Sequence, residues 1–198
     1  MLQYFISEKC VITGQQKWNK NIGISAKDWL KSFHFLKITT SDTKLHWFQI
    51  RILHNILTTN RTVSKFMLNQ TDMCEFCGSH SETIQHLMWN CTKVQHFWNE
   101  LITIIKKRCS NIQHIQLNET LVLFGYNTTS NYDSTFLLII LMAKFYIYRS
   151  KVQKTILKTR LFLQELYNRY KVEMYIHDNS KTFENTWAPY LQLFKALM

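Results

Sequence analysis

Four residues with metal-binding side chains follow one another closely in the sequence: Cys74, Cys77, His86 and Cys91. Their pattern is C-x2-C-x8-H-x4-C. Structural zinc is tetrahedral and takes cysteine thiolates and histidine imidazoles as ligands. A C-x2-C turn brings two thiolates to one metal ion, and Gly78 after it suits the left-handed backbone that such a turn often needs. The pattern therefore predicts one bound zinc ion.

The fourth ligand is less firmly specified than the three cysteines, because His80 and His96 are alternatives to His86 on spacing. Buried or redox-active thiols are the competing interpretation of the cysteines themselves. Four protein ligands complete a tetrahedral shell and leave no position for water. We therefore interpret the site as structural and not catalytic.

His86 and Cys91 are five residues apart, which does not place them on one face of a regular α-helix. We expect a short helix over 81–87 that ends near residues 89–90. Cys91 would then stand at the entry of the next helix, where the helix dipole favours a thiolate.

The remaining sequence predicts mainly helices. Only 4 Gly and 1 Pro are present, which leaves few residues for tight turns and favours long helices over many short strands. Apolar periodicity predicts helices over 61–68, 92–107, 134–150 and 153–175. Capping residues predict two more, one that begins after an N-cap at Asp42 and one that begins after an N-cap at Asn118 and ends before Gly125. The predicted fold class is mainly α, a helical domain with a small embedded zinc-binding knuckle.

Three segments make up this predicted organisation. Residues 1–40 form an N-terminal segment that we expect to have lost a covalent neighbour. Residues 41–110 form a zinc-binding helical region, and residues 111–198 form a C-terminal helical region packed on it. A length of 198 residues fits one domain, or two small ones that share a core.

The charge of the chain points to polyanionic partners. Lys and Arg number 24 and Asp and Glu 13, which gives a net charge of +11. RNA or DNA is the expected partner, with no small-molecule substrate. The candidate nucleic-acid contacts are Lys44, Arg51, Arg61, Lys65, Lys93, Lys151, Lys154 and Lys158. For each of them an ordinary solvated side chain is the competing interpretation.

Two observations bear on location. The most apolar run, residues 136–143, is much shorter than the roughly 20 residues of a membrane-spanning helix. The first residues also lack the basic and apolar parts of a secretory signal. We therefore expect no membrane span and an intracellular protein, without a choice between nucleus and cytoplasm.

Several segments in a fixed order resemble one family. They are Lys44-Leu-His-Trp-Phe-Gln-Ile-Arg-Ile-Leu-His54, the cysteine pattern, Glu82-Thr-Ile-Gln-His-Leu-Met-Trp-Asn-Cys91, Val94-Gln-His-Phe-Trp98, Leu123-Phe-Gly125 and Ala143-Lys-Phe-Tyr-Ile-Tyr-Arg149. Together they resemble the zinc-binding domain C-terminal to the polymerase in LINE-type non-LTR retrotransposon reverse transcriptases. The resemblance covers roughly residues 18 to 190.

This resemblance implies a module that helps to hold the element's RNA and the target DNA, with Cys74, Cys77, His86 and Cys91 as zinc ligands. It implies no catalysis in this chain, because the family's Tyr-x-Asp-Asp polymerase signature is absent and no endonuclease segment is present. We expect a detached C-terminal piece of a larger polyprotein. The alternative function is a protein-interaction module that docks a polymerase domain or a host protein, with zinc purely structural.

Overall fold

The computed structural model describes residues 8–109, 112–113, 115–125, 133–176 and 187–194. Its helices are α1 (Glu8–Asn19), α2 (Ala26–Thr39), α3 (Thr43–Leu53), α4 (Asn60–Val63), η1 (His86–Asn90), α5 (Thr92–Arg108), α6 (Glu119–Phe124), α7 (Ser134–Val152), α8 (Thr159–Ile176), η3 (Ala188–Tyr190) and α10 (Leu191–Phe194). Within the described ranges the extended structure is limited to one isolated bridge, between Met73 and Ser81. The prediction of a mainly helical domain is confirmed.

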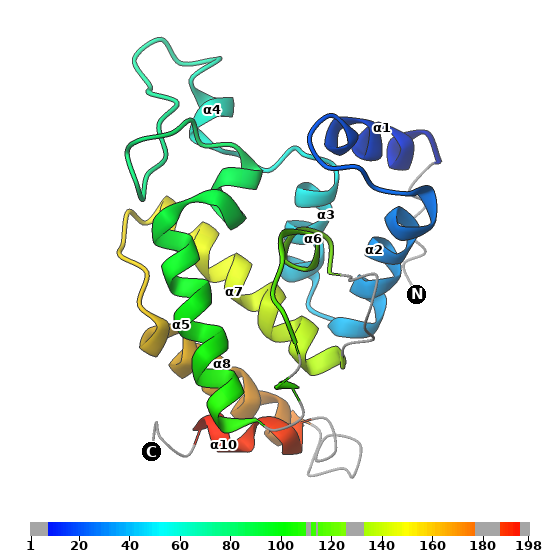
Figure 1. Cartoon of the computed structure of the whole chain (residues 1–198), viewed down its shortest axis with the longest axis vertical. Coiled ribbons are helices and arrows are strands. Elements are labelled where there is room, and N and C mark those ends of the chain that lie inside the picture. Colours follow the sequence, from blue (N-terminus) through cyan, green and yellow to red (C-terminus); the bar gives the residue numbers. More distant parts are fainter. Residues whose placement is uncertain (1–7, 110–111, 114, 126–132, 177–186, 195–198) are drawn as a thin grey trace.

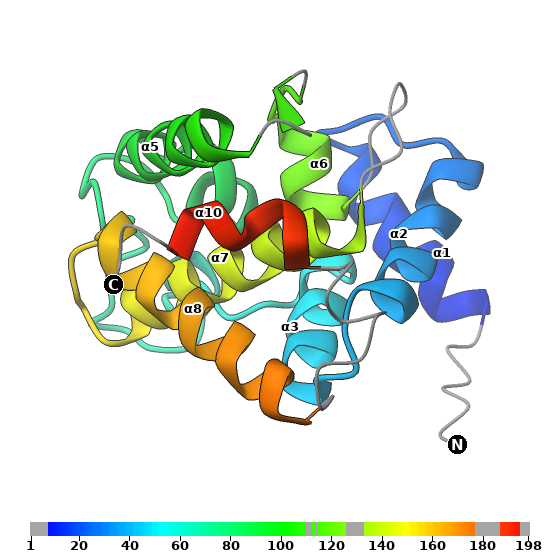
Figure 2. The same ribbon diagram turned by 90° about the horizontal axis from the view of Figure 1, so that it is seen from below.

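Helix α7 runs through the middle of the molecule and the other helices surround it (Figure 1). It contacts α2, α3, α6, α8 and η1. Seen from below, α1 and α2 lie together at one side of the molecule, and α10 lies across α7 in the view (Figure 2). Most of its side chains are buried, which agrees with its apolar sequence on all faces.

Local sequence signals set several helix ends. The side chains of Asp42, Asn118 and Asp133 accept hydrogen bonds from backbone N–H groups in the first turns of α3, α6 and α7. Helix α6 ends at Gly125, whose φ is +76°. A Cβ there would come within 2.4 Å of the Phe35 ring, so glycine is required for packing as well as for conformation.

One buried core connects the N-terminal helices to the C-terminal ones. Trp18 is 1% exposed, and its indole N–H donates to the carbonyls of Ile52 and Leu53 at the end of α3. Its ring lies edge-on to Phe124 of α6. Phe194, from the last turn described, is equally buried. The division into segments 1–40, 41–110 and 111–198 stays a prediction.

Three predicted helices differ from those observed. The helix expected over 61–68 is only the single turn of α4, and the helix expected from 153 begins at Thr159. Between α7 and α8, Lys154 has a positive φ of 54°, so the chain turns there and cannot continue as a helix. The helix expected over 81–87 is replaced by η1, a π-helix.

In the described part of the chain, no helix combines the length and apolar character needed to cross a membrane.

The core also holds a lysine, Lys144, which is 0% exposed. Its ammonium donates to Oε1 of Gln49, whose Nε2 donates to the carbonyl of Leu123 at 2.7 Å. Burial lowers the pKa of Lys144 from 10.5 to about 7. The unfolded chain therefore binds this proton more tightly, and the lysine destabilises the fold most below about pH 7 and ever less as pH rises toward 10.5.

Lys144→Met is expected to stabilise the protein at neutral pH. At neutral pH the substitution removes a free-energy penalty of up to about 4 kcal/mol for burying the ammonium. It costs about 2 kcal/mol by leaving Gln49 Oε1 without its donor. The free energy of unfolding should therefore rise by about 2 kcal/mol. Near about pH 9.5 the gain should vanish or reverse, because the penalty has faded. Urea denaturation of both proteins at the two pH values measures this, and an equal gain at both would contradict it.

Candidate metal centre

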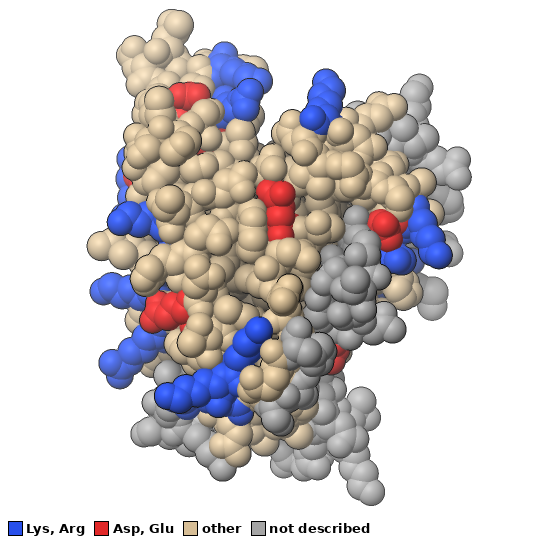
Figure 3. All heavy atoms as spheres, viewed as in Figure 1, with Lys and Arg blue, Asp and Glu red and all other residues tan. Residues whose placement is uncertain are grey.

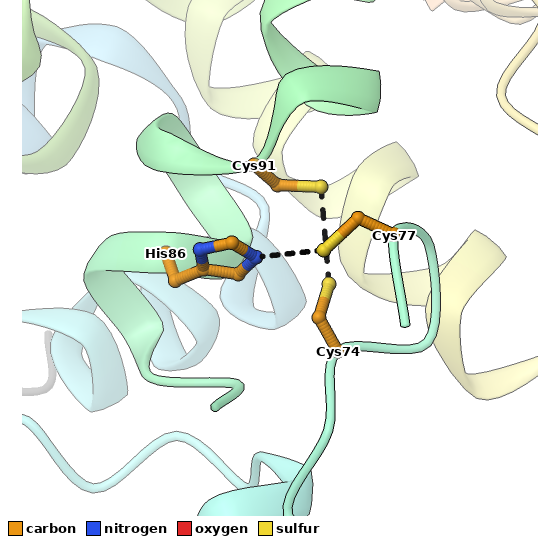
Figure 4. A group of neighbouring side chains, drawn as sticks. All are labelled: Cys74, Cys77, His86 and Cys91. Atoms are coloured by element: carbon orange, nitrogen blue, oxygen red, sulfur yellow. Dashed lines mark hydrogen bonds between the residues drawn. The ribbon is translucent and has the colours of Figure 1, made fainter. Parts of the chain in front are cut away.

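The structure brings Cys74, Cys77, His86 and Cys91 to one point (Figure 4). Each offers one ligand atom, and these atoms all lie within 4.8 Å of one another. Cys74 and Cys77 come from a turn, His86 is the first residue of η1, and Cys91 caps the N-terminus of α5. Three of the four side chains are buried and Cys77 is partly exposed.

The distances within this cluster fit a tetrahedral zinc ion. Zn–S bonds of about 2.3 Å place two sulfurs about 3.8 Å apart, and an imidazole nitrogen and a sulfur about 3.6 Å apart. Cys74 Sγ lies 3.8 Å from Cys91 Sγ, and Cys77 Sγ lies 3.4 Å from His86 Nε2. Three cysteines and one histidine are also a donor set that zinc prefers. The cluster is compatible with one zinc ion.

The C-x2-C turn is closed by backbone hydrogen bonds. Gly78 N–H donates to Cys74 O at 2.8 Å, and Gly78 has the left-handed φ of 62° expected from the sequence. The backbone N–H groups of Phe76 and Cys77 also bond to the sulfur of Cys74. These two donors favour the thiolate, which is the form that binds metal. The hydrogen bond to Cys91 and burial outweigh them and raise the pKa of Cys74 in the absence of a metal ion.

The π-helix η1 explains how His86 and Cys91 reach the same ion. Cys91 N–H donates to His86 O at 2.9 Å, a bond between residues five apart. This wider turn brings the two side chains to one side, which a regular α-helix would not do. The helical turn therefore lies closer to the C-terminus than the short helix expected over 81–87. The five-residue spacing of His86 and Cys91 is the sequence feature that corresponds to this π-helix.

Electrostatics around the ligands favour the metal-binding forms of two of them. A hydrogen bond from the Cys74 thiol lowers the pKa of Cys91 against the effect of burial, and the N–H groups of Val94 and Lys93 at the start of α5 act in the same direction. Burial lowers the pKa of His86, and the neighbouring His80 lowers it further. A neutral imidazole is the form that zinc requires.

Residues 12–98 match the family model described as zinc-binding in reverse transcriptase. This part of the chain, which is less than half of its length, is similar to reverse transcriptase zinc-binding domains. No curated protein and no solved structure matches the chain. The match contains all four cluster residues and ends within α5. The resemblance of residues 123–125 and 143–149 lies outside it and stays a prediction.

The two alternative histidines lie outside this cluster. The ring of His80 stacks on that of His86, with 5.4 Å between centroids, and is not among the clustered ligands. His96 is exposed on α5 and lines a surface groove. His86 is thus the histidine that the fold places with the three cysteines.

A carboxylate that the sequence analysis did not single out supports this centre. Glu82 is 0% exposed and accepts bonds from the N–H groups of Asn60 (2.8 Å) and Glu75 (3.0 Å). Its Oε1 also lies 3.2 Å from Lys151 Nζ. Glu82 therefore joins the start of α4, the C-x2-C turn and the end of α7. We call residues 72–91, which include it, the zinc knuckle.

This contact corrects one predicted nucleic-acid contact. Lys151 is 8% exposed and paired with Glu82, so the prediction that it contacts nucleic acid is wrong. Its ammonium pairs with the Glu82 carboxylate inside the fold. Without this partner the buried carboxylate would carry a large desolvation penalty. The other seven candidates are exposed: Lys44, Arg51, Arg61, Lys65, Lys93, Lys154 and Lys158.

The structure gathers two of these seven with two lysines that the sequence analysis missed. A cleft of about 460 Å³ is lined by Lys17, Lys20, Arg61 and Lys65, between α1, α4 and residues 83–85. No carboxylate belongs to the described lining. Basic side chains stand on both sides of the hollow between α4 and α1 in the surface view (Figure 3). We call this the basic cleft.

The cleft could not be predicted because its walls are distant in sequence. Asn21 Nδ2 lies 3.4 Å from Gln85 Oε1 and joins the end of α1 to the zinc knuckle. The spacing of Lys17 and Lys20, three residues apart near a helix end, was the available signal. Lys44, by contrast, lines a depression that also holds the carboxylates of Asp42 and Glu165.

Proposed function

We propose that this zinc-binding domain is a nucleic-acid-binding module without catalytic activity of its own, and that the basic cleft contacts phosphates. The resemblance to LINE-type elements suggests element RNA or target DNA as the ligand. The observation that carries the proposal is the convergence of four cations, from α1, from α4 and from the residues just after each helix, beside the zinc knuckle in a cleft without a carboxylate in its described lining. Such a surface attracts polyanions, because no carboxylate of the described lining pairs with its charges.

The position of the cleft next to the metal centre supports this proposal. Helix α4, which carries Arg61, is held to the zinc knuckle by two contacts of Asn60. Its N–H donates to Glu82, and its side-chain amide donates to Met73 O at 2.8 Å. Zinc thus acts as the scaffold that orders one wall of the cleft.

Neutralising the cleft should reduce the salt dependence of binding. Four phosphate contacts correspond to a slope of about −2.8 in log K against log salt for a single strand and about −3.6 for a duplex. We expect Arg61→Gln with Lys65→Gln to make the slope less steep by about 1.5 and to weaken binding at low salt. Fluorescence anisotropy over a salt series, with labelled single-stranded RNA and duplex DNA, measures this.

The matched control removes the same charge elsewhere. Lys37 in α2 and Lys107 in α5 are exposed and line neither the basic cleft nor the groove near His96. Lys37→Gln with Lys107→Gln should leave the slope nearly unchanged. Equal effects of the two pairs would show a diffuse charge effect, and an absence of binding by the unchanged protein would refute the proposed function.

The alternative, docking of a polymerase domain or a host protein, has one observation in its favour. Phe66, Met67 and Leu68 follow α4 and are 83%, 57% and 103% exposed. Three consecutive exposed apolar side chains mark a contact surface for another protein more readily than for phosphate. Phe66→Ser with Leu68→Ser should leave nucleic-acid binding intact and abolish association with an added polymerase domain.

A further inference from the structure

A second groove lies against the zinc knuckle, beside its C-x2-C turn. It has a volume of about 620 Å³. Glu75 and Phe76 of the turn, Thr92, Lys93 and His96 of α5, and residues 154–157 between α7 and α8 line it. The size lies within the range of small-molecule and nucleotide sites, about 300 to 1,000 Å³.

The chemistry of this groove differs from that of the basic cleft. Phe76, Ile156 and Leu157 are apolar lining residues, and Ile156 is 78% exposed. Lys93 and Lys154 add two exposed cations, against the single carboxylate of Glu75. An apolar, aromatic surface beside cations suits a planar aromatic group that carries negative charge nearby.

The two sites share the zinc knuckle as a wall. Residues 83–85 line the basic cleft, and residues 75–76 line the groove. The knuckle is internally fixed, because Glu82 bonds to Glu75 and Cys74 N–H donates to His80 O at 2.8 Å. A ligand that contacts both sites therefore meets phosphate-binding cations on one side of the knuckle and an aromatic surface on the other.

We propose that the groove binds an unstacked base of a single-stranded nucleic acid whose phosphates also occupy the basic cleft, with Phe76 as the stacking side chain. This inference rests on the proposed function and makes it more specific, because the bases of a duplex are paired and cannot enter such a groove. Lys93 and Lys154 contact the phosphates that flank the base. Stacking tolerates any base, so the site selects single strands and not a sequence.

The test compares three ligands of about 16 nucleotides. They are labelled oligo-dT, a duplex of the same length, and a strand of abasic residues with the same phosphates. Phe76→Leu should weaken oligo-dT binding about 10-fold, since a stacked base contributes about 1 to 3 kcal/mol. The change should have no effect on the abasic strand or the duplex. Phe66→Leu, which alters an exposed aromatic outside both sites, is the matched control.

Each outcome has a defined meaning. An equal loss on oligo-dT and on the abasic strand, or no loss on either, would overturn the stacking role of Phe76 while leaving the basic cleft as the binding site. No binding of any ligand by the unchanged protein would refute the proposed function itself. Zinc content of Phe76→Leu, measured by elemental analysis, must stay at that of the unchanged protein, because only the side chain beside Cys77 is altered.

Discussion

Cys91→Ser is expected to release zinc and to unfold the zinc knuckle together with the start of α5. Cys91 is 0% exposed, its sulfur receives the N–H groups of Lys93 and Val94, and it stands where α5 begins. A serine hydroxyl is a poor zinc ligand, so three ligands would remain. Loss of the Cys91 thiolate should therefore release the metal ion and loosen the N-terminus of α5 at the same time.

The expected effect is large because, apart from the hydrogen bonds of Glu82 and the turn, little apolar packing holds the segment before η1. The described residues between α4 and η1 contain one isolated bridge and few buried apolar side chains, with Cys74 and Ile84 among them. Zinc binding contributes about 10 to 16 kcal/mol in small structural sites, which is comparable with the whole stability of about 5 to 15 kcal/mol of a typical domain. Metal removal should therefore cost most of the fold of residues 72–85, which precede the buried helix η1.

Two measurements check this prediction. Elemental analysis gives the zinc content, and circular dichroism with a chelator titration gives the helical transition. Cys109→Ser is the matched control, because Cys109 is 1% exposed but lies outside the cluster. A Cys91→Ser protein that keeps one zinc ion and its thermal transition would exclude Cys91 as a ligand.

The second large effect is expected at Glu82. Glu82→Gln leaves the ammonium of Lys151, itself 8% exposed, without its buried counter-charge. Breaking one partner of a buried ion pair costs about 3 to 5 kcal/mol. Each carboxylate oxygen of Glu82 accepts one N–H group, from Asn60 or from Glu75. Glutamine has a single side-chain oxygen and would keep only one of these two hydrogen bonds, so the start of α4 should also loosen.

A double-mutant cycle separates the ion pair from general damage. In the Glu82→Gln background, Lys151→Met removes the unpaired charge, so the double change should cost less than the sum of the single ones by about 1 to 3 kcal/mol. Urea denaturation of the zinc-loaded proteins measures all four. Glu165→Gln is the control, because it breaks an Arg149 pair that is 38% and 41% exposed, where about 1 kcal/mol or less is expected. Strict additivity at Glu82 and Lys151 would contradict their pairing.

Local signals in the sequence were sufficient for several elements. The caps Asp42 and Asn118 predicted the starts of α3 and α6, and the apolar stripe predicted α5 over 92–107 against the observed Thr92–Arg108. These features depend on side chains within one or two turns of the chain. The prediction of a helix over 61–68 was wrong beyond its first turn, because its apolar residues 66–68 are exposed and gain little packing from the described part of the chain.

The sequence by itself determined the metal-binding residue types, the turn at Gly78 and the helical class, because each depends on neighbours close along the chain. Only the tertiary structure decided which histidine joins the cysteines and that Lys151 forms an ion pair with Glu82. It also decided that Lys17 and Lys20 line one cleft together with Arg61 and Lys65. The physical reason is that burial and charge pairing are set by segments that are distant in sequence, and no local pattern records which of them will meet.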